Sequence, residues 1–108
     1  MIPMNQDIVD AAKRAGIPVE DIRGELSIAF TGNAFMIYMD NDTRPGSALF
    51  IVAVLGVLPY DVAGALVKRA EGHWGVRYGI SRKWAPTLTE ACAHAIVAAY
   101  PAKEAAPE

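Results

Sequence analysis

The sequence is poor in several features that would assign it to a class at once. It has one cysteine, Cys92, so an internal disulfide is excluded and a reducing compartment is expected. Charged residues make up 20% of the 108 residues and the net charge is −2, which argues against a protein that coats nucleic acid over its whole surface. The N-terminus has no basic stretch followed by an apolar run, so we expect no secretory signal and a cytoplasmic protein.

Motifs that carry chemistry are also missing from the sequence. There is no G-x-x-x-x-G-K-[ST] and no G-x-G-x-x-G pattern for binding phosphates or dinucleotides. Cys92 and His94 are two residues apart, so on a helix they point in different directions, and the spacing of His73 relates it to neither. Asp40 and Asp42 lack the glycine and the distal glutamate of a calcium loop. We therefore predict no catalytic residue, no metal, no cofactor and no enzymatic activity.

The strongest positive feature is the run from Ala48 to Leu58, which contains no polar side chain. It is too short for a helix that crosses a bilayer, which takes about 20 residues. Phe50, Ile51 and Val52 are strand formers, and Pro59 ends the run. These residues predict a central strand that is covered on both faces.

The residues before this run predict a helix and a hairpin. The helix is expected from Gln6 to Ala15, since Gly16-Ile17-Pro18 supplies a left-handed stop and a breaker. Residues 25–30 and 34–39 alternate as two strands around the turn Thr31-Gly32-Asn33. Residues 11–26 resemble a repressor-type helix-turn-helix, but we favour a helix followed by a turn into the sheet.

The residues after the run predict a helix from Asp61 to Glu71, a fourth strand from Trp74 to Ile80 and a loop from Ser81 to Pro86. The last helix starts at the capping box Thr87–Glu90 and stops at Pro101. The expected order is α-β-β-β-α-β-α. We predict a single α/β domain over residues 1–100, a three-layer sandwich around a four-stranded mixed sheet, with a flexible tail over 101–108. A two-layer α+β fold that dimerises is the alternative.

Charge is distributed unevenly along the chain. Residues 1–67 carry four basic and eight acidic side chains, whereas residues 68–84 carry five basic side chains and one acidic one. The second stretch is also rich in aromatic side chains. It therefore holds the predicted partner-binding residues, which are Arg69, His73, Arg77, Arg82, Lys83 and Trp84.

Two family resemblances accompany this pattern. The second half, from Leu58 to Ala99, resembles small phage-encoded α/β/α sandwich domains, in which a tryptophan-containing strand leads to a final Ala-rich helix. That resemblance implies a phage accessory protein, a class that includes small inhibitors of host machinery. The run from Ile8 to Leu66 is similar to type III secretion chaperones, which implies an acidic dimer that binds an extended segment of its partner.

We therefore predict a protein-interaction module that binds or inhibits a host protein complex through residues 69–84. Two alternatives stay open: a chaperone-like homodimer, and a nucleic-acid-binding protein in which the cations hold phosphates while Trp84 stacks on a base. We prefer a protein partner over nucleic acid because the chain as a whole is acidic. No membrane partner is expected.

Overall fold

The computed structural model describes residues 2–60 and 64–102 of the protein. Three helices alternate with two groups of three strands, in the order α1 (Asn5–Ala15), β1 (Val19–Ile22), β2 (Glu25–Phe30), β3 (Asn33–Met36), α2 (Pro45–Leu55), β4 (Val67–Ala70), β5 (His73–Tyr78), β6 (Ser81–Ala85) and α3 (Leu88–Ala99). The strands form two separate antiparallel sheets, β1-β2-β3 and β4-β5-β6. The protein is mixed α/β, as predicted, but the predicted element order and the single four-stranded sheet are not observed.

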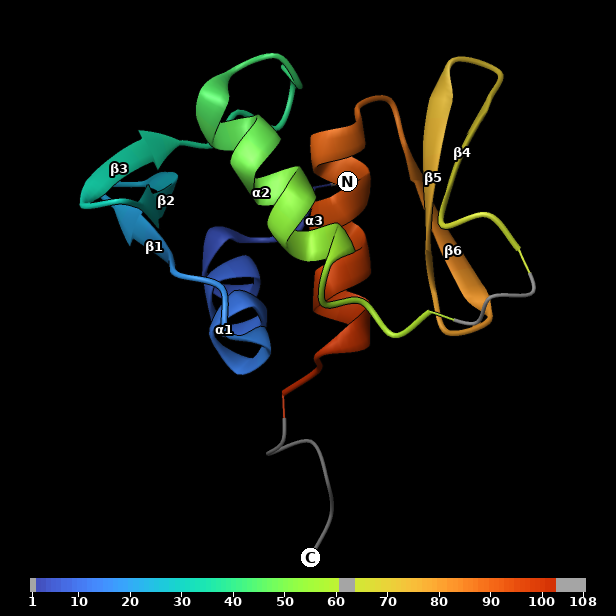
Figure 1. The fold of residues 1–108 in the computed structure, drawn as a ribbon, viewed down its shortest axis with the longest axis horizontal. Coiled ribbons are helices and arrows are strands. Elements are labelled where there is room, and N and C mark those ends of the chain that lie inside the picture. The colour runs from blue at the N-terminus through green and yellow to red at the C-terminus, as the bar shows by residue number, and fades with distance from the viewer. Residues whose placement is uncertain (1, 61–63, 103–108) are drawn as a thin grey trace, which may run out of the picture.

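The helices lie between the two sheets (Figure 1). α3 stands in the middle and packs against α1 and α2 on one side and against β5 and β6 on the other. Small side chains on α3 make this close packing feasible, since Ala91, Cys92, Ala93 and Ala95 are all fully buried. The prediction of a sandwich with a sheet as its middle layer is therefore wrong, because the helices form the middle layer and the sheets lie on either side.

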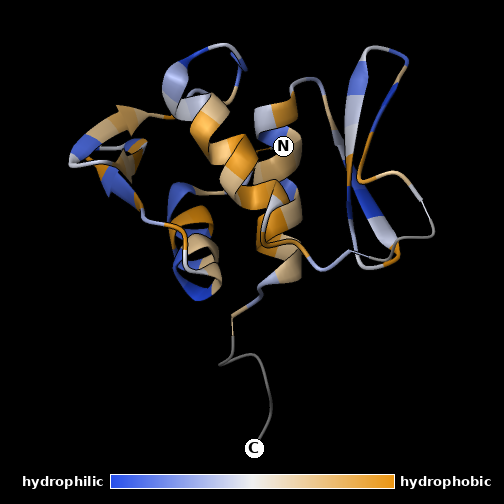
Figure 2. Cartoon of the chain, in the orientation of Figure 1, coloured by the Kyte–Doolittle hydropathy of each residue, from blue (hydrophilic) through white to orange (hydrophobic). Residues whose placement is uncertain are grey.

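The apolar run forms a helix rather than the predicted strand. The helix, α2, begins before the run at Pro45, where the fixed φ favours a helix start and the missing N–H is not needed. Eleven helical residues exceed the usual length of a buried strand, and this length is the signal that the strand prediction overlooked. Figure 2 shows α2 apolar along most of its length. One side of it is uncovered, because Val52 is 71% exposed.

Close contact with the first sheet fixes the start of α2. A Cβ on Gly46 would lie 2.8 Å from the Phe35 carbonyl oxygen and closer still to the Met36 carbonyl, so only glycine fits. The hydroxyl of buried Ser47 accepts from the Tyr38 N–H at 2.8 Å and donates to the Tyr38 carbonyl at 2.9 Å. These two hydrogen bonds from the Ser47 side chain hold the segment just after β3 against the start of α2.

The first half otherwise follows the sequence closely. α1 ends at Gly16, whose φ is 85° and whose N–H reaches the carbonyls of the last turn, as predicted. The hairpin of β2 and β3 turns at Thr31-Gly32, both with positive φ, which confirms the predicted hairpin. β1 was not predicted, and as a strand over residues 19–22 it rules out the helix-turn-helix.

The second half departs from its prediction. Over residues 64–71 the predicted helix is absent and β4 stands in its place, while residues 61–63 lie outside the described part of the chain. The predicted loop from Ser81 to Pro86 is mostly strand β6. Ile80 is not on a strand face as expected but at the tip of the β5–β6 hairpin, 84% exposed. Within the described residues, no helix has the length and apolar character to cross a membrane.

Candidate functional site

The register of the second sheet separates its side chains into two faces. Directly opposed residues in antiparallel strands share a face, and consecutive residues along a strand lie on opposite faces. The inner face contains fully buried Val76 and packs on α3. The outer face points away from the helices, and we define it by six residues: Lys68, His73, Gly75, Arg77, Arg82 and Trp84.

Trp84 lies across the outer face on top of Gly75. The two residues are directly opposed in β6 and β5, and a Cβ on Gly75 would come within 2.8 Å of Cη2 and Cζ3 of the indole. An aromatic ring over a cross-strand glycine fills the space that the glycine leaves and gives a flat apolar platform. Trp84 remains 44% exposed in this position.

The two arginines of the outer face are tied to the backbone. Arg82 donates from Nη1 to the carbonyls of Gly75 at 3.0 Å and Leu66 at 3.3 Å, and from Nη2 to Ala65 at 2.5 Å. Arg77 donates from Nε to the Gly79 carbonyl at 3.1 Å. Arg82 therefore links β5 to the segment that enters β4, and its cation is only partly available to a ligand.

The six predicted binding residues are thus divided between the faces. His73, Arg77, Arg82 and Trp84 lie on the outer face, whereas Arg69 and Lys83 lie on the inner one, opposite Trp74 and Val76 respectively. The Arg69 guanidinium sits 4.7 Å from the centre of the Trp74 ring, in a cation–π contact.

Lys68 is the outer-face residue that the sequence prediction left out. It is exposed and lies in one row with Gly75 and Trp84. The pairing of β4 with β5 places it on this face, and the predicted helix over this segment left no such pairing to consider.

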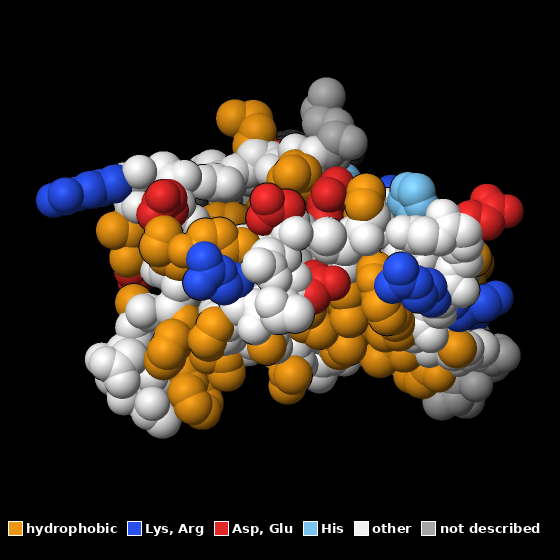
Figure 3. Space-filling view, turned by 90° about the horizontal axis from the view of Figure 1, so that it is seen from above, with side chains coloured by type: hydrophobic (Ala, Val, Ile, Leu, Met, Phe, Trp, Pro, Cys, Tyr) orange, Lys and Arg blue, Asp and Glu red, His pale blue; other side chains and the backbone are white. Residues whose placement is uncertain are grey.

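A hollow of about 390 Å³ opens beside the indole, lined by Ala70, Glu71, His73 and Trp84. It adjoins the β4–β5 hairpin turn. In Figure 3, basic side chains lie next to apolar ones at the end of the molecule that this sheet forms, and other basic side chains lie at the opposite end. The outer face therefore combines a flat ring, cations and a recess in one place.

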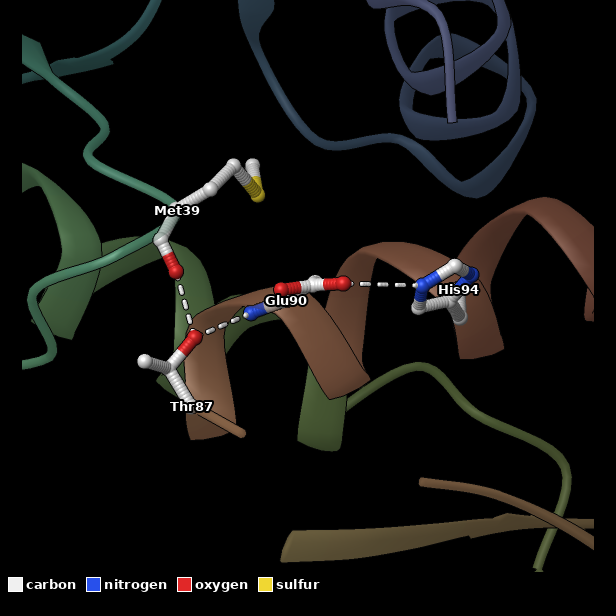
Figure 4. Close-up of polar contacts among 4 residues, drawn as sticks. All are labelled: Met39, Thr87, Glu90 and His94. Atoms are coloured by element: carbon white, nitrogen blue, oxygen red, sulfur yellow. Dashed lines mark hydrogen bonds and ion pairs between the residues drawn. The ribbon is translucent and has the colours of Figure 1, made fainter. Parts of the chain in front are cut away.

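The start of α3 is held by side chains from both halves of the chain. Thr87 accepts from the Glu90 N–H at 3.2 Å and donates to the Met39 carbonyl (Figure 4). Glu90 does not complete the predicted capping box, because its carboxylate pairs with His94 at 3.3 Å. The Asp42 carboxylate accepts from the N–H groups of Leu88 at 2.9 Å and Thr89 at 2.8 Å, and from the Thr89 hydroxyl at 2.6 Å.

Cys92 is poorly suited to nucleophilic chemistry. It is fully buried on α3, and this burial, with a smaller contribution from the Asp42 charge, raises the pKa of its thiol from 9.0 to about 12. A thiol with that pKa is protonated at neutral pH, and the thiolate is the reactive form. His73 is exposed on the far sheet and His94 is paired with Glu90. Over residues 2–60 and 64–102, no three His, Cys, Asp or Glu side chains form a metal-binding group.

Two other recesses lie in the first half. An apolar one of about 280 Å³ lies between β2 and α2, beside Phe30 and Val52. A second, of about 350 Å³, lies between the N-terminus and the end of β3 and includes Tyr38. Charged and aromatic side chains also meet at this second recess, since Glu25, Tyr38 and Asp40 line it and the Arg44 guanidinium lies 4.7 Å from the centre of the Tyr38 ring. Among the described residues, neither of these two recesses is lined by a tryptophan.

No protein-family model matches this sequence, and neither a curated protein nor a solved structure was found to match it. The function therefore has to be argued from the outer face itself.

Proposed function

We propose that this protein is a non-enzymatic interaction module that binds another protein through the outer face of its second sheet. The phage resemblance of the sequence implies a host complex as the partner, and we keep that as part of the proposal. Arg69 and Lys83 lie on the inner face and are not part of the proposed outer-face contact, whereas Lys68 is.

The observation that carries the proposal is the exposed indole of Trp84. Tryptophan is the side chain most enriched among residues that dominate binding energy, and it loses little conformational entropy when it is already held in place. Here the ring lies over Gly75, and Cδ of Arg82 lies over the same glycine. A partner side chain inserted in the recess beside Ala70 and His73 would pack against the edge of this ring.

The charge of the outer face indicates the chemistry of the partner. Lys68 is exposed and Arg77 is half-buried, whereas the acidic side chain nearest to this face is Glu71 in the hairpin turn. Opposite charges across an interface speed association and discriminate between partners. We expect an acidic patch on the partner, centred on an apolar residue that covers Trp84.

The test compares matched double variants on the two sheets. The partner is first captured from the host cell lysate and purified, and its Kd is then measured by calorimetry. Lys68→Ala with Trp84→Ala should weaken binding by about thirtyfold or more, since a tryptophan at the centre of an interface costs about 2 kcal/mol or more on truncation. Ile22→Ala with Met36→Ala, on the exposed face of the first sheet, should leave the Kd unchanged. Equal loss in both pairs would contradict the proposal.

Single-stranded nucleic acid is the second candidate ligand, because a flat indole beside cations also suits a stacked base. A labelled oligothymidylate titration at two salt concentrations distinguishes the two. Binding that falls steeply with salt and is lost in Trp84→Ala would favour nucleic acid, because phosphate contacts release counterions. Absence of oligothymidylate binding, together with loss of protein-partner binding in Trp84→Ala, would favour the first proposal.

A further inference from the structure

β4 is an edge strand with one side unpaired. It pairs with β5 alone, and among the described residues no helix or other strand packs closely against it. An unpaired strand edge presents a row of N–H and C=O groups that another extended segment can pair with.

The backbone groups that face this edge can be assigned from the register. The Arg77 N–H donates to the Leu66 carbonyl at 2.9 Å, so Leu66 and Arg77 form a hydrogen-bonded pair. Such pairs alternate along antiparallel strands, which turns the backbone groups of Lys68 toward β5 and those of Val67 and Arg69 outward.

The turn between β4 and β5 independently indicates the same outward-pointing backbone groups. Its two turn residues, Glu71 and Gly72, both have positive φ, at 52° and 77°. A two-residue turn of this type closes on a hydrogen-bonded pair, here Ala70 with His73. Ala70 is two residues from Lys68, so the backbone groups of both residues face β5. The N–H groups of Val67 and Arg69 therefore again point outward.

The side chains along the edge select the occupant. Lys68 lies on the outer face and Arg69 on the inner face, both exposed, while Val67 is half-buried. A strand added beside them would set consecutive residues opposite Arg69 and Lys68, and unlike charges are favoured in such cross-strand positions. A second copy of β4 would place cations against cations, so self-pairing is disfavoured.

We infer that the partner contributes an extended acidic segment that pairs with the edge of β4 as a fourth strand. Two adjacent acidic residues lie beside Arg69 and Lys68, and a β-branched apolar residue follows beside Val67. This inference rests on the proposed function and deepens it, since it names the form of the partner's contact segment at the same sheet.

The test uses a fluorescein-labelled peptide with two adjacent glutamates followed by a valine, set between threonines. Amide hydrogen exchange of the protein is recorded by NMR with and without the peptide. Exchange at the Val67 and Arg69 amides should slow by about fivefold or more on binding, since each gains a hydrogen bond worth about 1 kcal/mol. Exchange at the Lys68 amide, already bonded to β5, should change little.

Backbone-directed variants provide the controls. Arg69→Pro removes the outward N–H and leaves the β4–β5 bonds in place, so it should bind the peptide more weakly than Arg69→Ala, which removes only the side chain. If Arg69→Pro does not fold, methylating alternate amide nitrogens of the peptide tests the same bonds on the intact protein. A peptide with lysines in place of the glutamates should not bind.

The outcomes separate this inference from the proposed function. If the purified partner requires Trp84 but leaves the Val67 and Arg69 amides in fast exchange, strand addition is wrong and the outer-face proposal stands. If the peptide slows exchange at these amides but Lys68→Ala with Trp84→Ala binds the partner normally, the outer-face proposal is wrong. If the peptide does not bind at millimolar concentration, the inference is refuted.

Discussion

The two sheets have the same strand topology but carry different kinds of side chain on the faces that point away from the helices. Each is a three-stranded antiparallel meander whose first hairpin turns on a non-glycine residue followed by glycine, Arg23-Gly24 in one and Glu71-Gly72 in the other. The side of the first sheet that faces away from the helices carries Glu20, Glu25 and small or aliphatic side chains. The same side of the second sheet carries cations and an indole. The architecture alone therefore does not set the function; the outward residues do.

The sheets also differ in how glycine is used. Gly46 brings the backbone of α2 against the backbone of β3, so the space at this glycine is closed by main chain. Gly75 is covered by Cδ of Arg82 and by the ring of Trp84, so the space there is closed by side chains. The first arrangement should be rigid and structural, the second adjustable. The predictions below test this contrast.

The largest effect is expected for Gly46→Ala. The added methyl would overlap the backbone of Phe35 and Met36, and the main chain has to move to relieve it. We expect a loss of about 3 kcal/mol or more in the free energy of unfolding, measured by urea denaturation. Gly56→Ala is the control, because a Cβ there meets the Val52 carbonyl oxygen at an ordinary 3.5 Å. A Gly46→Ala protein as stable as Gly56→Ala would mean that α2 is not docked as described.

The second effect concerns the link between the halves at Asp42. Asp42→Ala leaves the N–H groups of Leu88 and Thr89 and the Thr89 hydroxyl without their acceptor. We expect a loss of about 2 kcal/mol in the free energy of unfolding, as for a strong helix cap. Asp42→Asn, which keeps one acceptor oxygen, should lose less, and exposed Asp40→Ala should lose little. Equal stability of the Asp42 and Asp40 alanine variants would contradict this assignment.

The predictable parts of the fold were those fixed by local chemistry. The stop at Gly16, the Thr31-Gly32 turn and the Thr87 cap each depend on a few adjacent residues, and each is present in the structure. The alternation of apolar and polar side chains in β5 also predicted its two faces, and Val76 on the apolar face is fully buried.

One error came from a local signal that was overlooked. The run from Ala48 to Leu58 has no polar residue to mark a period, so helix and strand had to be distinguished by length and by Pro45. The other features that the sequence did not predict depend on contacts between distant residues. The capping role of Asp42 spans 46 residues to Leu88, and that of Arg82 depends on carbonyls that β4 brings near. The candidate site residues were chosen by composition, but their division between two faces required the register.

The third effect appears in the pH dependence of stability. The pKa of the Cys92 thiol is raised to about 12 in the folded protein from 9.0, so the unfolded chain loses this proton first as the pH rises. Below pH 9 the contribution is fully present, and between pH 9 and 12 it declines by at most about 1.4 kcal/mol per pH unit.

Urea denaturation with a reductant present, at several values between pH 8 and 10.5, measures this effect. Wild type should lose stability with a steeper slope above pH 9 than Cys92→Ala, in which lysine and tyrosine titrations are unchanged. Parallel slopes would show that the thiol is not sequestered in the core between the sheets.

The smallest effect on stability is expected for Gly75→Ala, the counterpart of Gly46→Ala on the second sheet. The new methyl would meet Arg82 Cδ at 2.7 Å and the Trp84 ring at 2.8 Å; the ring can rotate away, whereas Arg82 can shift only slightly because its guanidinium is held by backbone carbonyls. We expect a loss of about 1 kcal/mol or less in the free energy of unfolding, together with a shift in tryptophan fluorescence as the indole leaves the sheet. Partner affinity should fall well beyond what that stability loss explains, because the platform for the indole is gone. Unchanged fluorescence and unchanged affinity would mean that the position of Trp84 over Gly75 has no part in binding.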